Sequence, residues 1–188
     1  DASLGYYSLI GLEGAGIIEM VAVFFMFIAG ANFALHFAAF YPLSRWKPPS
    51  FRLYLRDSEF RAYATGLLFL IVFVVGRLIQ SGQYEDMSEA VTKGLFQAVS
   101  MATTTGFTTD NYSAWPGALP VLLILASFVG GCAGSTGGGM KVIRWLLIYK
   151  QGRREVIKLV HPSAEIPVKL GDKAVPSRVT EAVWGFFS

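Results

Sequence analysis

Five threonines and one glycine lie within residues 101–110, which read Met-Ala-Thr-Thr-Thr-Gly-Phe-Thr-Thr-Asp. The chain shows no pairing of a nucleophile with a base, so the chemistry of this stretch is non-covalent. Carbonyl oxygens of an extended backbone are hard ligands that suit a dehydrated alkali cation. Gly106 can adopt a positive φ, which allows consecutive carbonyls to face one axis. We therefore predict a potassium-type metal site formed by the backbone of Thr103, Thr104, Thr105, Gly106 and Phe107.

A second unusual stretch is the glycine-rich run at residues 130–139, in which six of the ten residues are glycine. Each glycine inside a helix costs roughly 1 kcal/mol relative to alanine, so a continuous helix here would be destabilised by several such increments. Helix packing through Gly-x-x-x-Gly spacing is the alternative, but it requires fewer glycines. Broken helices mark ion sites and gates in transporters. We therefore predict a gate loop below the cation site that contains Gly130, Gly131, Gly134, Ser135, Thr136, Gly137, Gly138 and Gly139.

Four charged or polar side chains in or beside apolar segments leave alternatives open. Lys141 follows the glycine run and either adds an electrostatic barrier in the pore or extends to cytoplasmic lipid. His36 is either a proton relay or a partner in an interhelical hydrogen bond. Glu19 and Arg77 lie near the outer ends of apolar segments, where we expect a position at the membrane boundary.

The elements that must position these stretches are long apolar segments. The chain is 53% hydrophobic and only 15% charged, whereas soluble domains carry about a quarter charged residues, which argues against a soluble enzyme and a disordered tail. Residues 17–41 and 62–79 are each long enough, at about 1.5 Å per residue, to cross a hydrocarbon core of about 30 Å. A third segment, 118–149, is interrupted by the glycine run. It predicts a helix over 118–129, a loop, and a helix from Met140 onward.

A shorter helix is predicted over residues 86–101, with Asp86 as its N-cap and an acidic residue three positions later. At some 20 Å it is too short to span, so it reads as a re-entrant half-helix whose negative C-terminal end points toward the bilayer centre. Basic residues are concentrated after the first and third apolar segments, which places those regions in the cytoplasm. The predicted fold is an all-α polytopic membrane protein ordered span, span, re-entrant loop, span.

Further features of the whole sequence bear on its function and domain organisation. The net charge of +3 is too small to indicate nucleic-acid binding, and the single cysteine cannot form an internal disulfide. An offset of 101 residues pairs Gly16 with Gly117, Phe27 with Phe128 and Gly30 with Gly131, which suggests a weak internal repeat. The chain opens without methionine and stops within an apolar stretch, so we expect it to be a piece of a longer protein.

The run Thr-Thr-Gly-Phe-Thr at residues 104–108 resembles a potassium-channel filter, Thr-Val-Gly-Tyr-Gly, that has kept its first glycine and lost its second. A span–pore-loop–span unit with such a single-glycine filter resembles the Trk/Ktr/HKT superfamily of potassium transporters. The glycine run and the residues from Thr103 through Trp115-Pro-Gly are similar to its bacterial TrkH branch. The resemblance covers nearly the whole chain, and the lost glycine leaves the strictness of potassium selectivity open.

The resemblance implies one polypeptide with four repeats around a central pore. Residues 1–41 would end a preceding repeat with its closing membrane helix, and 42–61 would form a cytoplasmic linker. Residues 62–160 would be a complete potassium-channel-like span–pore-loop–span repeat, and 161–188 a cytoplasmic linker and the start of the next repeat.

The resemblance also implies potassium uptake across a plasma membrane, the bacterial inner membrane, by a multi-pass protein embedded in the lipid bilayer. It further implies a homodimer and a cytosolic nucleotide-binding regulatory subunit, TrkA-like. No cofactor is expected, and no enzymatic activity. Coupling to protons, to sodium or to neither stays open. The alternative is a subunit of a homotetrameric potassium channel, and four non-identical filter loops in the full-length sequence would argue against it.

Overall fold

The computed structural model describes residues 15–41, 49–161, 169–170, 173–174 and 185. This part of the chain is helical, as predicted, apart from a small antiparallel pairing of β1 (Lys169–Leu170) with β2 (Lys173–Ala174). Most of the linker expected over 161–188 lies outside the described residues. The helices are α1 (Ala15–Ala29), α2 (Phe33–Phe40), α3 (Arg52–Arg56), α4 (Ser58–Ser81), α5 (Met87–Ala102), α6 (Leu119–Val129) and α7 (Val142–Val160), with a 3-10 turn at Tyr112–Ala114.

Helix α4 confirms the second predicted span and extends it at both ends to 24 residues. It begins where the Asp57 carboxylate accepts a hydrogen bond from the Phe60 amide at 2.6 Å. It ends at Gly82, which adopts the left-handed conformation that favours glycine, with φ at 65°. Among the described helices, α4 is long and apolar enough by itself to cross a membrane.

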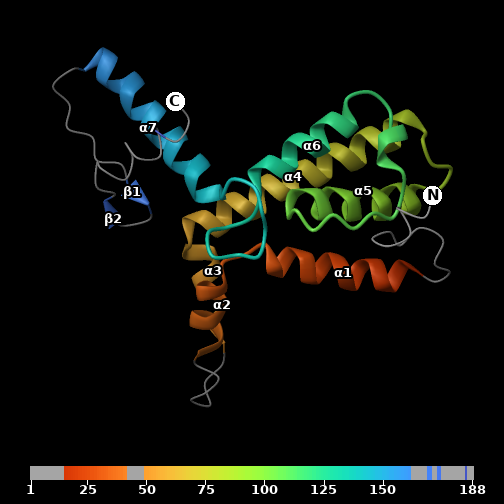
Figure 1. Ribbon diagram of the computed structural model, residues 1–188, viewed down its shortest axis with the longest axis horizontal. Helices are drawn as coiled ribbons and strands as arrows, with labels where there is room; N and C mark the ends of the chain where they lie inside the picture. Colours follow the sequence, from red (N-terminus) through yellow and green to blue (C-terminus); the bar gives the residue numbers. More distant parts are fainter. Residues whose placement is uncertain (1–14, 42–48, 162–168, 171–172, 175–184, 186–188) are drawn as a thin grey trace.

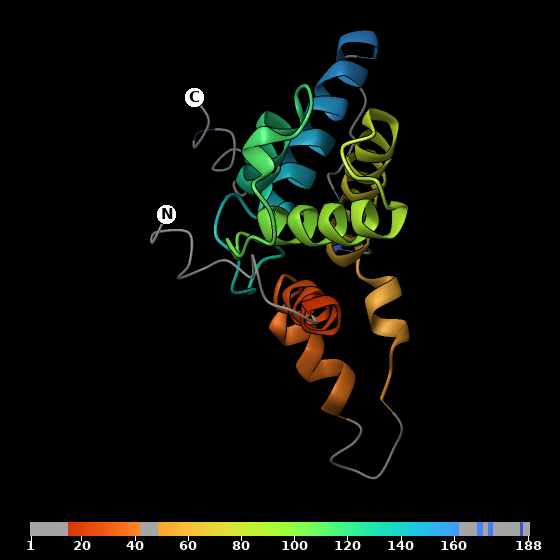
Figure 2. The same ribbon diagram turned by 90° about the vertical axis from the view of Figure 1, so that its right-hand side faces the viewer.

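The first predicted span is wrong as a straight helix, because residues 17–41 are bent by 96° between α1 and α2. Asn32 causes a new helix to start at this point, since its side chain accepts a hydrogen bond from the Ala34 amide at 2.8 Å. Figures 1 and 2 show α2 running steeply away from the end of α1. The bent pair is a second candidate for crossing a membrane only if it counts as one broken span.

The third apolar segment is broken close to where the sequence predicts. Helix α6 ends at Val129 and α7 begins at Val142. The 11 residues of α6 cover only about 16 Å, which is too short to span alone. Helix α7 runs away from the group formed by α1, α4, α5 and α6 (Figure 1).

Helix α5 confirms the predicted short helix and lies at the centre of the packing, while its re-entrant placement stays a prediction. Asp86 caps it by accepting a hydrogen bond from the Ser88 amide at 3.0 Å. On one side Phe96 and Val99 are buried in a cluster with Tyr63 of α4. On the other side Ala98 is buried with Leu78 of α4 and with residues of α6. The end of α5 is therefore held in place by its neighbours on both sides.

An ion pair joins α1 to α5 as well. Lys93 of α5 contacts Glu19 of α1 at 2.8 Å. Glu19 is 2% exposed, so it lies inside the helix packing, and its position at the membrane boundary stays a prediction. A buried carboxylate needs such a partner, because an unpaired charge is costly in an apolar environment.

Glycine at position 94 is required by the close approach of α5 to α4. A Cβ atom there would lie 2.9 Å from a methyl carbon of Val75 and 3.1 Å from one of Leu78. We expect Gly94→Ala to destabilise the protein by about 1–3 kcal/mol through overpacking. The measurement is thermal unfolding of the full-length protein in detergent. Gly76→Ala in α4 is the matched control, since no atom lies within 4 Å of its added Cβ; equal melting temperatures for the two variants would contradict the expectation.

Candidate functional site

The backbone of the predicted cation site alternates between right-handed and left-handed conformations. Thr103 is right-handed at φ −87°, Thr104 is left-handed at φ 58°, and Gly106 is left-handed at φ 83°. A β-branched residue rarely adopts a positive φ, so Thr104 is held in an unfavourable conformation, as occurs at functional sites. Alternation of this kind lets successive peptide groups face the same side of a loop.

Threonine and serine hydroxyls hold the two ends of the stretch. The Thr103 hydroxyl donates to the Val99 carbonyl at 2.8 Å, and the Ser100 hydroxyl donates to the Phe107 carbonyl at 2.6 Å. Between these ends, the carbonyls of Thr104, Thr105 and Gly106 accept no hydrogen bond within the described residues. Three adjacent carbonyls are therefore left without a partner among the described residues.

The glycine loop, residues 130–139, lies directly against the start of this stretch. The Gly138 amide donates to the Thr104 hydroxyl at 2.5 Å. A Cβ atom on Gly137 would lie 3.2 Å from the Thr103 carbonyl oxygen. The structure thus brings together two stretches that the sequence analysis selected separately.

The other side of the glycine loop rests on the break between α1 and α2. The Cys132 amide donates to the Gly30 carbonyl at 2.8 Å, and the Phe33 amide donates to the Gly134 carbonyl at 3.2 Å. A Cβ atom on Gly131 would lie 2.7 Å from the Gly30 carbonyl oxygen, so side chains here would prevent the contact. These contacts account for much of the glycine content of the loop.

The sequence analysis missed this break, although two signals pointed to it. Gly30 and Asn32 are a glycine and a helix-capping residue inside an apolar run. The 101-residue offset also pairs Gly30 with Gly131, and each of these residues lies in the break that follows its helix.

Glu59 is a second residue that the sequence analysis missed. Its Oε1 accepts a hydrogen bond from the Ala133 amide at 2.6 Å, and the residue is 6% exposed. In the sequence, Glu59 is one of several charged residues that precede an apolar helix, so no local signal distinguishes it.

Two residues with alternative assignments now have contacts. Both ring nitrogens of His36 are hydrogen-bonded, Nδ1 to the Tyr54 hydroxyl at 2.6 Å and Nε2 to the Ile28 carbonyl at 2.9 Å, which agrees with the interhelical hydrogen bond. The Lys141 ammonium donates to the Gly137 carbonyl, so its side chain turns to the glycine loop. A role for Lys141 in pore electrostatics stays a prediction.

The chain that follows the predicted cation site, residues 103–107, is held in place by a polar cluster in the connecting loops. The Tyr84 hydroxyl donates to Asp110 Oδ2, and the Trp115 indole donates to the same oxygen at 3.2 Å. The Asn111 amide donates to Asp110 Oδ1 at 2.6 Å. Burial raises the pKa of the Tyr84 hydroxyl above its usual value, and the hydrogen bond to Asp110 raises it further.

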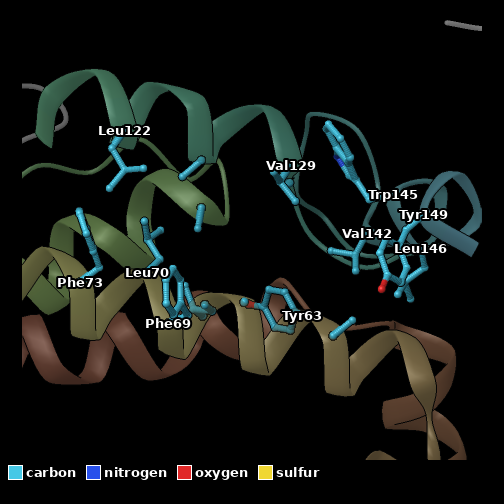
Figure 3. Close-up of a pocket in the computed structure, with 16 residues that line it drawn as sticks. Tyr63, Phe69, Leu70, Phe73, Leu122, Val129, Val142, Trp145, Leu146 and Tyr149 are labelled. Carbon is cyan, nitrogen blue, oxygen red and sulfur yellow. The ribbon is translucent and has the colours of Figure 1, made fainter. Parts of the chain in front are cut away.

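A cavity of about 560 Å³ opens between α4, α6 and α7 (Figure 3). Its lining is apolar and aromatic, with Phe69 and Phe73 of α4 facing Leu122 of α6. It lacks the convergent oxygen ligands that an alkali cation needs, so it is not the cation site. No cluster of histidine, cysteine or acidic residues that could hold a metal ion occurs in the described part of the chain.

A comparison with known protein families identifies the family of this chain. The family model described as TrkH, cation transport protein, matches residues 1–188. The chain belongs to the TrkH family of cation transport proteins. This membership confirms the resemblance in the sequence and places the chain in a membrane transport family, not an enzyme family.

Individual relatives support the same family assignment. The chain is 47% identical over 193 residues to the Trk system potassium uptake protein TrkH of Vibrio parahaemolyticus, covering 100% of the chain and 37% of the relative. It is 35% identical to the Trk system potassium uptake protein TrkG of Escherichia coli, covering 98% of the chain and 38% of the relative. The crystal structure of the potassium transporter TrkH from Vibrio parahaemolyticus superposes with a TM-score of 0.88 at 45% identity, covering 96% of this chain and 38% of that one. The chain thus spans little more than a third of these relatives.

The polar cluster around Tyr84 leads to a prediction about ionisation. Because burial and the Asp110 carboxylate both oppose the tyrosinate, the ultraviolet difference titration between the wild-type full-length protein and Tyr84→Phe should develop only above the ordinary tyrosine value of about 10. Replacing Asp110→Asn in both proteins removes the carboxylate charge, so the difference signal should move toward that value. A difference signal centred at or below pH 10 with Asp110 intact would contradict the prediction of a raised pKa for Tyr84.

Proposed function

We propose that the full-length protein takes up potassium across the bacterial inner membrane as a multi-pass transporter. The backbone of Thr103 to Phe107 selects the cation, and the glycine loop gates its passage. The observation that carries the proposal is the contact between the two stretches, in which the Gly138 amide binds the Thr104 hydroxyl at 2.5 Å. Relatives at 47% and 35% identity are named potassium uptake proteins, which supports potassium as the cargo.

The filter role is supported by the free carbonyls and by the helix that precedes them. Thr104, Thr105 and Gly106 present carbonyls without partners in the described part of the chain, as a dehydrated cation requires. The C-terminal end of α5 carries about half a negative charge, which favours a cation next to it. Neither contribution involves covalent chemistry.

The gating role is supported by where the loop lies and how it is held. Gly137 and Gly138 contact the first two filter residues, on the side that the charge distribution places toward the cytoplasm. The loop is held by separate hydrogen bonds from backbone groups and side chains, and not by the repeating bonds of a continuous helix. Such a segment can move away without unfolding its neighbours.

The proposed assembly has four span–pore-loop–span repeats in one polypeptide around a central pore. Residues 1–41 close a preceding repeat, 62–160 form a complete repeat, and the linkers at 42–61 and 161–188 face the cytoplasm. A homodimer and a TrkA-like nucleotide-binding regulatory subunit complete the transporter. The greater length of the relatives favours this arrangement over a homotetramer of short channel subunits, because one chain then has room for several filter loops.

The filter assignment is tested with Gly106→Ser. A serine at φ 83° is strained, so the carbonyls should turn and the preference for rubidium over sodium should fall several-fold in uptake assays on cells that express the full-length protein. Gly117→Ser is the matched control, because Gly117 also has a positive φ of 66° and open space around it but lies away from the filter stretch. Unaltered cation selectivity in Gly106→Ser would contradict the assignment.

The gate assignment is tested by shortening the glycine loop. Deletion of residues 137–139 removes the contacts to Thr103 and Thr104, so rubidium uptake should rise several-fold when it is normalised to the amount of protein in the membrane. Thr104→Val removes only the hydroxyl that the Gly138 amide binds and should raise uptake less, while Thr104→Ser keeps this acceptor and serves as the control. Unchanged uptake after the deletion would argue against gating.

A further inference from the structure

Glu59 places a buried negative charge next to the glycine loop, and helix capping does not account for it. Asp57 already caps α4 through the Phe60 amide at 2.6 Å. The Glu59 side chain, in the first turn of α4, instead reaches the Ala133 amide at 2.6 Å. A carboxylate that is 6% exposed must be compensated, and this contact is one compensation.

Helix α7 supplies the second compensation. The helix has no acidic residue in its first turn and no side-chain cap of its own, so its first amides need acceptors. The amide of Ile143, in that first turn, and the Lys141 ammonium are both near enough to act electrostatically on the Glu59 carboxylate. Glu59 thus places its carboxylate near the N-terminal end of α7, where a negative charge is favoured.

Glu59 therefore binds the proposed gate loop near its start and acts electrostatically just after its end. Ala133 lies near the start of the glycine loop, and Ile143 lies just after its end. The rest of the loop is held by backbone groups and neutral hydroxyls, apart from the Lys141 contact to the Gly137 carbonyl. A hydrogen bond to a charged acceptor is stronger than these neutral ones.

We propose that Glu59 is a positioning residue that clamps the glycine loop against the filter by binding the Ala133 amide and by placing its carboxylate near the first turn of α7. This inference rests on the proposed gating role of the loop. Glu59 does not touch the transported cation in this arrangement; it acts through the loop. Its loss changes how often the loop leaves the filter and leaves the selectivity of the filter unchanged.

Cys132 provides a direct readout of the clamp. It is the only cysteine of the chain, it is 0% exposed, and it precedes the residue that Glu59 binds. In the full-length protein, any cysteine outside this chain is replaced by serine, and Cys132 is labelled with a small membrane-permeant maleimide. The labelling rate, corrected for the thiolate fraction obtained from its pH dependence, measures how often the loop opens; the correction is needed because the nearby Glu59 charge also acts on the thiol. This rate does not depend on transport.

We expect Glu59→Ala to raise the labelling rate of Cys132 and the rubidium uptake several-fold, with an unchanged rubidium-to-sodium ratio. Glu59→Gln keeps an acceptor but loses the charge, so it should raise labelling at least twofold, and less than alanine does. Glu155→Ala is the matched control, because Glu155 is an exposed carboxylate of α7 that is bonded to Gln151. Its labelling rate should equal that of the wild type.

A Cys132 labelling rate in Glu59→Ala within twofold of the wild type would overturn the proposal. If Glu59→Ala does not reach the membrane, Glu59→Gln is used instead, and a Cys132 labelling rate within twofold of the wild type would overturn the proposal. A changed rubidium-to-sodium ratio would also overturn it, because the residue would then act on the filter itself. If the wild-type protein carries no rubidium while Glu59→Ala still labels faster, the proposed function fails and the clamp stands.

Discussion

Backbone groups that are released where a helix breaks need hydrogen-bond partners when the break is buried in protein. The structure meets this requirement by setting two breaks against each other. The amide of Cys132 binds the carbonyl of Gly30, and the amide of Phe33 binds the carbonyl of Gly134. The position of the glycine loop follows from this mutual pairing, and so does its contact with the end of α5.

Glycine and threonine have separate tasks in this arrangement. Gly131 and Gly137 leave room for backbone to approach backbone, because a Cβ there would lie 2.7 Å and 3.2 Å, respectively, from a carbonyl oxygen. Hydroxyls of Thr103 and Ser100 hold residues 103–107 at both ends, and the carbonyls of residues 104–106 accept no hydrogen bond from the described part of the chain. Under the proposed function, this stretch is fixed in shape and keeps carbonyls for a cation, which a fully hydrogen-bonded loop does not.

The sequence predicted the local features well, since each depends on residues that are neighbours along the chain. The cap at Asp86, the half-helix after it and the break in the third apolar segment all appear within two residues of their expected bounds. The bend at Asn32 was missed because hydropathy favoured one continuous span over residues 17–41, and a single capping residue is a weak signal against it. The family resemblance rested on adjacent residues too, and the comparison confirms it.

By itself, the sequence determined which segments are apolar, where α5 and α6 begin and end, and that the backbone is irregular after each of them, because these properties arise from local chemistry. Only the tertiary structure decided which breaks pair, that Lys141 turns to the Gly137 carbonyl, and that the Glu59 carboxylate reaches Ala133 across 74 positions of the chain. Such contacts depend on how helices pack against one another. No spacing within the chain reports that packing.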